Sequence, residues 1–166
     1  SPMFCHHGAP IRDLSGKTLA IWGRGNIGSR LAQMAQAFGV RVIWGEHKHA
    51  AAVREGYTAF DEALAQADII SLHCPLNEQT RNMIGEAELQ RMKPRAVLIN
   101  VGRGGLVDEY AVMAALKYGQ LGGAGFDVLT AEPPREGNPL LARLPNLIVT
   151  PHTAWASEEA LNTMTH

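Results

Sequence analysis

The chain has 166 residues, of which 46% are hydrophobic and 19% charged, as expected for about one folded domain. Fifteen basic and sixteen acidic side chains leave a formal charge of −1, which argues against nucleic-acid binding or a membrane-surface patch. No apolar run approaches the ~18 residues that a membrane span needs. Cys5 and Cys74 show no metal-type spacing, so we expect no metal site and favour a reducing, cytoplasmic location.

Both ends of the chain suggest a piece of a longer protein. The sequence opens with Ser-Pro rather than Met, and no charged-then-apolar leader follows. It stops at ALNTMTH, where the pattern predicts a helix that has just begun. We therefore expect a further domain outside this sequence.

Short apolar runs alternate with segments of helical period, a pattern typical of βαβ units on a parallel sheet. Strands are predicted at 18–22, 40–44, 68–72, 96–100, 123–128 and 147–150. Helices are predicted at 27–38, 61–67, 85–92 and 108–118. Strands this continuously apolar are usually covered on both faces, so we expect an α/β, Rossmann-like, doubly wound parallel sheet.

Individual residues support these bounds. Apolar side chains recur at helical spacing in the first helix, at Ile27, Leu31, Met34, Ala35 and Phe38. Gly39 and Gly119 are placed to end helices, and Asp108 to begin one. The segment 131–140 is the one long proline-rich connection, which makes it a candidate functional loop.

The segment GRGNIG follows the first strand and opens the first helix. Alone it is weak evidence, because glycines also make ordinary turns. In this position Gly23 permits a tight turn, Gly25 lets a pyrophosphate approach the backbone, and Gly28 lets the helix pack closely. The amides around Asn26 and Ile27 would then face the phosphates. This context predicts a dinucleotide-binding loop.

An acidic residue, Glu46, follows the second strand, where dinucleotide-binding proteins carry one. A carboxylate there accepts hydrogen bonds from the ribose hydroxyls and repels a 2′-phosphate, which favours NAD over NADP. The neighbours His47, Lys48 and His49 form a basic cluster that can accommodate a 2′-phosphate. NAD is therefore the favoured cofactor and NADP the less favoured one.

Further motifs follow in order: HCPLNEQTRNMIG, MKPRAVLINVGRGGLVDE, GAGFDVLTAEPP and TPHTAWAS. Together with GKTLAIWGRGNIG they resemble the nucleotide-binding half of the D-isomer-specific 2-hydroxyacid dehydrogenases, and several segments are similar to the glycerate dehydrogenase (hydroxypyruvate reductase) branch. The resemblance implies a dinucleotide-binding domain at 13–155. It also implies a linker from a missing substrate domain at 1–12 and the start of a truncated return helix at 156–166.

The resemblance also assigns roles to residues. The family's catalytic trio falls on Arg103, Glu132 and His152. Cofactor contacts beyond the glycine loop and Glu46 fall on Cys74, Pro75, Thr80, Val101, Gly102, Arg103, Asp127 and His152.

The chemistry of the trio agrees with these roles. Arg103 offers a bidentate fork for a carboxylate, and His152 can supply a proton near neutral pH. Glu132 would orient the imidazole and favour its charged form. Each residue alone is more typical of a turn or loop, and only their joint position behind strands favours the functional interpretation.

We therefore expect an NAD-dependent oxidoreductase that interconverts a short 2-oxo acid and its D-2-hydroxy acid, with hydroxypyruvate and D-glycerate favoured. We expect the full-length protein to be a homodimer, although the sequence itself leaves the oligomeric state open. The alternative is an NAD(H)-sensing, corepressor-like protein on the same fold, and a formate dehydrogenase relative is disfavoured by Glu132. We interpret four histidines as surface or linker residues: His6, His7, His47 and His49. We interpret His73 as a core residue or as one that supports residues of the site from behind.

Overall fold

The computed structural model describes residues 14–127 and 147–149. The elements in chain order are β1 (Thr18–Trp22), α2 (Asn26–Ala37), β2 (Arg41–Trp44), α3 (Phe60–Gln66), β3 (Ile69–Leu72), α4 (Glu86–Arg91), β4 (Val97–Asn100), α5 (Glu109–Lys117), β5 (Gly123–Phe126) and β6 (Leu147–Val149). Every predicted strand and helix is confirmed, with bounds that differ by at most two residues. A 3-10 turn at Gly104–Leu106, which the sequence pattern did not predict, follows β4. In the described part of the chain, no helix combines the length and apolar character needed to cross a bilayer.

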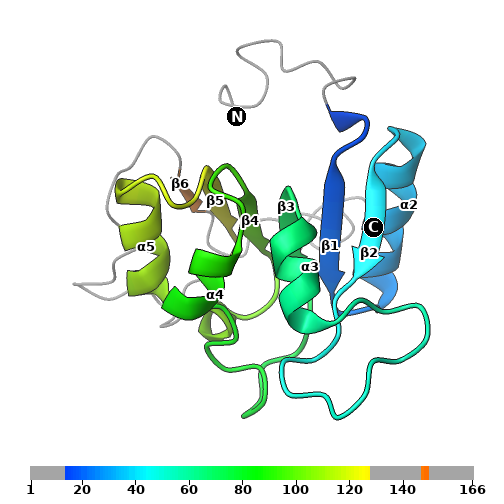
Figure 1. Cartoon of the computed structure of the whole chain (residues 1–166), viewed down its shortest axis with the longest axis horizontal. Helices are drawn as coiled ribbons and strands as arrows, with labels where there is room; N and C mark the ends of the chain where they lie inside the picture. Colours follow the sequence, from blue (N-terminus) through cyan, green and yellow to red (C-terminus); the bar gives the residue numbers. More distant parts are fainter. Residues whose placement is uncertain (1–13, 128–146, 150–166) are drawn as a thin grey trace, which may run out of the picture.

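The six strands lie side by side in the order β2-β1-β3-β4-β5-β6, and all pairs are parallel (Figure 1). From β1 the chain passes outward to β2 and then returns across β1 to β3, so the winding direction reverses between β1 and β3. A parallel bridge between Gly45 and Thr58 continues the sheet beyond β2. Open α/β sheets bind ligands at the carboxyl ends of strands where the winding reverses, so this edge positions the site.

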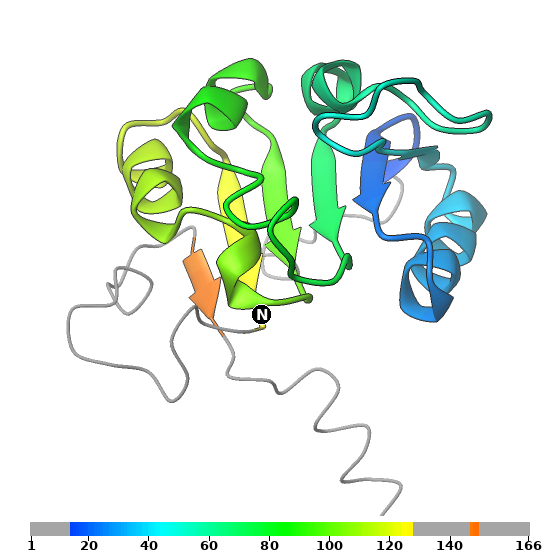
Figure 2. The same cartoon turned by 90° about the horizontal axis from the view of Figure 1, so that it is seen from below.

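Side chains alternate across the sheet and build two cores. On one face, Ala20 and Trp22 of β1 share a buried cluster with residues of α3, α4 and α5, among them Leu64 and Val112. On the other face, Leu19 and Ile21 pack with α2. Figure 2 shows α3, α4 and α5 on one side of the sheet and α2 on the other. The expected doubly wound arrangement is confirmed.

Helix α2 packs on the sheet through its small residues. Gly28, Ala32 and Ala35 are its buried positions, whereas Ile27 and Met34 are each 61% exposed. Most of the large apolar side chains whose spacing predicted this helix are therefore not the ones that pack it. Small residues at this interface let the helix approach β1 closely, which puts its first turn beside the end of that strand.

Substitution by alanine is predicted to have different effects at two glycines of the first loop, Gly23 and Gly25. At Gly23 the backbone has φ +101°, and a Cβ would lie 2.6 Å from the carbonyl carbon of His73. At Gly25 a Cβ would meet nothing within 4 Å. We expect Gly23→Ala to lower both stability and dinucleotide affinity. Gly25→Ala is expected to change the unfolding free energy by less than about 1 kcal/mol, as for other compatible Gly→Ala sites, yet to weaken dinucleotide binding.

Urea unfolding and NADH titration by fluorescence measure the two effects separately. Gly16→Ala is a matched control for the strain, because Gly16 has φ +85° with open space around it and lies at the opposite end of β1. NADH affinity that is normal in Gly25→Ala would contradict the assignment of this loop.

Candidate functional site

The turn after β1 is shaped by close backbone contacts. Gly23 packs against the backbone of His73 and Cys74, which directly follows β3. A Cβ on Gly28 would overlap the carbonyl oxygen of Gly23. Any side chain at these two positions would therefore push β1, β3 and α2 apart. The turns after β1 and β3 thus form one continuous floor at the point where the winding reverses.

The first turn of α2 is suited to an anion. Gly25 is its N-cap residue and offers no side-chain cap, and no acidic side chain lies in the first turn. Asn26 and Ile27, which the sequence predicted to face phosphates, are exposed. An uncapped helix start with open space over Gly25 matches what the pyrophosphate of a dinucleotide requires. The residues present therefore fit the predicted cofactor at this position.

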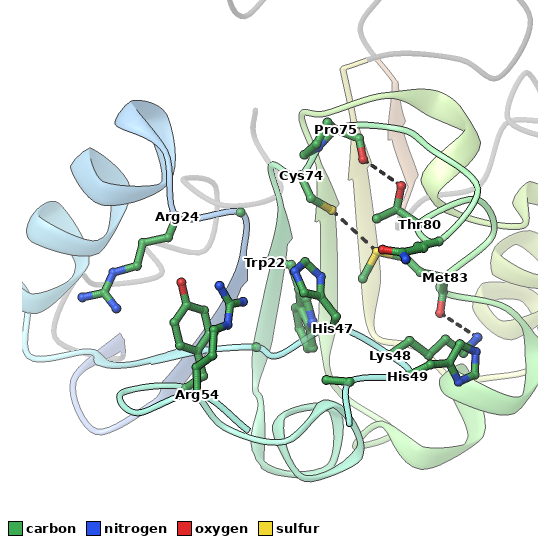
Figure 3. A pocket seen from close by; sticks show the side chains of 15 residues that line it. Trp22, Arg24, His47, Lys48, His49, Arg54, Cys74, Pro75, Thr80 and Met83 are labelled. Atoms are coloured by element: carbon green, nitrogen blue, oxygen red, sulfur yellow. Dashed lines mark hydrogen bonds between the residues drawn. The ribbon is translucent and has the colours of Figure 1, made fainter. Parts of the chain in front are cut away.

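A pocket of about 560 Å³ opens beside this turn (Figure 3), within the usual range for small-molecule sites. Its lining comes from the turns that follow β1, β2 and β3 and from the segment 79–83. The lining residues are Trp22, Gly23, Arg24, Gly45, His47, Lys48, His49, Ala50, Arg54, Tyr57, Cys74, Pro75, Gln79, Thr80 and Met83.

The pocket brings together Gly23, Cys74, Pro75 and Thr80 from the predicted cofactor set, whereas the first turn of α2 lies outside its lining. His47 and His49 are exposed, as predicted for surface residues, and both line the pocket together with Lys48, the third member of the predicted basic cluster. Arg24, Arg54 and Tyr57 were missed altogether. Only the position of Arg24 inside GRGNIG could have signalled its role in advance.

Glu46 follows β2 as predicted, but its carboxylate is turned away from the pocket. The side chain is 2% exposed and lies outside the pocket lining. Arg54 donates from Nη2 to Oε1 at 2.7 Å and from Nε to Oε2 at 2.9 Å. The backbone amides of His47 and Arg54 donate to the same carboxylate at 2.8 and 2.9 Å. Contact between Glu46 and a ribose therefore stays a prediction.

These donors change the titration of Glu46. The side-chain hydrogen bonds from Arg54, aided by the backbone amides of Arg54 and His47, outweigh burial and lower the pKa of Glu46 from 4.5 to about 2. The backbone of Glu46 is held as well, because its carbonyl accepts a hydrogen bond from Trp22 Nε1 at 2.9 Å. The acid thus closes the loop 47–54 onto the end of β2.

The loop after β3 forms the opposite wall. Thr80 is buried, and its hydroxyl donates to the carbonyl of Pro75 at 2.7 Å and accepts from the amide of Asn77 at 2.9 Å. Cys74 lies with its Sγ 3.6 Å from Met83 Sδ, and burial raises the pKa of its thiol to about 11. His73 hydrogen-bonds Ser71, and burial lowers the pKa of its imidazole. Burial therefore disfavours the charged forms of both Cys74 and His73.

The turn after β4 is held by a buried amide that sequence reasoning overlooked. Asn100 is fully buried, accepts from the amide of Gly102 at 3.0 Å and donates to the carbonyl of Arg103 at 3.0 Å. A Cβ on Gly102 would lie 3.2 Å from the carbonyl oxygen of Cys74, so this turn abuts the β3 turn. The Arg103 side chain is exposed and forms no ion pair or hydrogen bond with any described residue.

The structure describes only two of the four remaining predicted site residues. Val101 is half-buried beside Gly102, and Asp127 is 3% exposed, its amide donating to the carbonyl of Asn100 at 3.0 Å. Glu132 and His152 lie outside the described residues. The roles implied for all four therefore stay predictions.

The Glu46–Arg54 pair is predicted to make folding sensitive to acid. Because the folded-state pKa of Glu46 is depressed, the stabilisation is fully present above about pH 4.5. It is lost as the pH falls towards about 2. Arg54→Met removes the largest cause of the shift, so the unfolding free energy of the variant should depend less on pH across this range.

Urea unfolding at a series of pH values between 2 and 6 measures this difference. Arg41→Met is the matched control, because Arg41 hydrogen-bonds Gln66 rather than a carboxylate. Parallel pH profiles for the wild type and Arg54→Met would contradict the assignment.

Comparison with known proteins places the chain. Residues 5–154 match the family described as "D-isomer specific 2-hydroxyacid dehydrogenase, NAD binding domain". A glycerate dehydrogenase of Methylorubrum extorquens is 49% identical over 97% of the chain and 50% of the relative. The chain therefore spans about half the length of this curated relative.

Solved structures agree. A D-isomer specific 2-hydroxyacid dehydrogenase from Lactobacillus delbrueckii ssp. bulgaricus, in its NAD-complexed form, is 38% identical, with a TM-score of 0.78 over 93% of this chain and 51% of that one. An acyclic imino acid reductase in complex with NADPH and D-Arg is 36% identical, with a TM-score of 0.74 over 92% of this chain and 50% of that one. The chain belongs to the D-isomer-specific 2-hydroxyacid dehydrogenases and contains their NAD-binding domain.

Proposed function

We propose that the protein containing this chain is an oxidoreductase that reduces a short 2-oxo acid to its D-2-hydroxy acid with NADH. Hydroxypyruvate is the favoured substrate, in line with the glycerate dehydrogenase relative. The observation that carries the proposal is the Asn100-anchored turn, which presents Arg103 at the same edge of the sheet as the glycine loop. A second domain outside this chain would complete the substrate side.

The dinucleotide, when bound, supplies the hydride for the carbonyl carbon. Arg103 binds the carboxylate of the substrate, and its charge also stabilises negative charge that develops on the carbonyl oxygen. His152 donates the proton that this oxygen needs. Glu132 orients the imidazole and favours its protonated form. Asn100 keeps the backbone of Arg103 in place through its buried amide.

We also propose that the full-length protein forms a homodimer through α2. Its solvent-exposed side carries Ile27 and Met34, each 61% exposed, and Phe38, 44% exposed, directly follows the helix. A cluster of exposed apolar side chains on one helix is unusual for a surface that meets only water. A second copy of the same helix would cover it.

We place the protein in the cytoplasm, where the buried free thiol of Cys74 would stay reduced.

The proposed activity predicts a strong effect at Arg103. With NADH and hydroxypyruvate, the full-length protein should show turnover. Arg103→Ala should lower kcat/KM by roughly 30- to 5,000-fold, about 2–5 kcal/mol, the scale of a charge-assisted pair to substrate. Arg95→Ala is the matched control, because Arg95 is an exposed arginine at the opposite end of β4. A wild-type protein that binds NADH without turning over hydroxypyruvate or glyoxylate would overturn the proposal.

The dimer proposal predicts that a charge on α2 separates the subunits. Met34→Glu places a carboxylate in the apolar face, and burying it unpaired in an interface is costly. Light scattering of the full-length protein should change from dimer to monomer, whereas Tyr118→Glu, at an exposed aromatic residue that directly follows α5, should remain dimeric. A dimer that persists in Met34→Glu would show that another surface joins the subunits.

A further inference from the structure

Basic side chains line the pocket wall formed by the loop after β2. His47, Lys48, His49 and Arg54 line it from this loop, and Arg24 lines it from the glycine turn. No aspartate or glutamate is among the described residues that line the pocket. Figure 3 shows Arg24 and Arg54 on one side of the cavity and Lys48 and His49 on another. A ligand group that enters here meets donors and positive charge.

The acid predicted to discriminate between cofactors lies behind this wall. In the Glu46–Arg54 pair the carboxylate side chain is 2% exposed and the arginine side chain 52% exposed. Both carboxylate oxygens already accept hydrogen bonds, from Arg54 and from two backbone amides. The negative charge is therefore compensated on the protein side, and the face presented to the pocket is the guanidinium.

The other two positively charged side chains, Lys48 and Arg24, differ in whether a carboxylate already compensates their charge. Lys48 forms an ion pair with the carboxylate of Glu88 at 2.7 Å, so its charge is largely compensated. Arg24 forms no ion pair with any described residue. Its guanidinium carbon lies 4.7 Å from the ring centre of Trp44 and 5.7 Å from that of Tyr57. The same Tyr57 ring carries Arg54 at 3.9 Å, so the two guanidinium groups share one aromatic support.

We infer that Arg54 sets the cofactor selectivity of this site by holding the Glu46 carboxylate behind the pocket wall, so that the site accepts the 2′-phosphate of NADPH. The inference deepens the proposed function, on which it rests for the binding of a nicotinamide dinucleotide. A 2′-phosphate brings close to two negative charges and three acceptor oxygens, which suit the uncompensated Arg24. The repulsion that an acid after β2 normally exerts is absent, because that acid is paired and buried. Arg54 thus acts as a positioning residue through Glu46.

Calorimetric titration of the purified protein tests this without turnover. Dissociation constants are measured for NADPH and NADH, and for 2′,5′-ADP and ADP, which carry the distinguishing phosphate without the nicotinamide. The wild type should bind NADPH with a Kd within about tenfold of that for NADH, a difference of about 1.4 kcal/mol or less. Arg54→Met frees Glu46, so the ratio of Kd(NADPH) to Kd(NADH) should rise by at least about tenfold.

A double variant shows whether Arg54 acts through Glu46 or binds the phosphate directly. If Arg54 acts through Glu46, then Glu46→Gln combined with Arg54→Met should recover most of the lost NADPH affinity, because no carboxylate remains to repel the phosphate. Equal losses in the single and the double variant would overturn the inference, since Arg54 would then bind the phosphate directly. Arg41→Met, far from the pocket lining, should leave both ratios unchanged. Should Arg54→Met fail to fold, Arg54→Lys keeps the charge but not the fork, and its ratio should lie above the wild-type value.

The outcomes separate this inference from the proposed function. A wild type that binds NADH and ADP but rejects NADPH and 2′,5′-ADP by more than about a hundredfold overturns the inference and leaves the reductase proposal intact. Binding of both cofactors without turnover of 2-oxo acids supports the inference and overturns the reductase. Binding of neither cofactor overturns both.

Discussion

The structure depends on three strand ends that approach so closely that no side chain fits between them. Gly23 touches the backbone after β3, Gly28 touches the carbonyl of Gly23, and Gly45 lies against the ring of Trp22. Each contact is possible only because the residue lacks a Cβ. Together they bring α2, the β2 turn and the β3 turn around one point, where the winding of the sheet reverses. The pocket exists at that point because the backbone itself forms its floor.

Burial of an acid is the second condition that shapes the site. A carboxylate removed from water is costly unless charge and hydrogen bonds replace the water. Glu46 receives both from Arg54 and from two loop amides, which ties residues 47–54 to the end of β2. The same contacts that make the loop stable also decide which charge faces the ligand. In the proposed assignment, stability of the loop and choice of cofactor are therefore coupled through one pair of side chains.

The turn after β4, on the proposed substrate side, rests against the turn after β3, on the proposed cofactor side. Asn100 holds the turn that carries Arg103, and Gly102 rests against the carbonyl of Cys74 on the cofactor side. The exposed guanidinium itself forms no ion pair or hydrogen bond with any described residue, which leaves it available for the substrate contact proposed above.

The sequence by itself determined the order and type of the secondary structure, because the alternation of apolar runs and the glycine and aspartate caps act locally. It also located the glycine loop, because the role of glycine there depends on the absence of a Cβ. Tertiary structure decided the features that local sequence patterns do not encode, namely which side chains pack and where a side chain points. The packing face of α2 follows from close approach to β1, which favours Gly28, Ala32 and Ala35 over the larger apolar residues. The direction of the Glu46 carboxylate depends on Arg54, eight positions later, and the pocket location of His47 and His49 depends on the loop that this pair closes. Such outcomes arise from contacts between segments that periodicity treats separately, so only the folded chain reveals them.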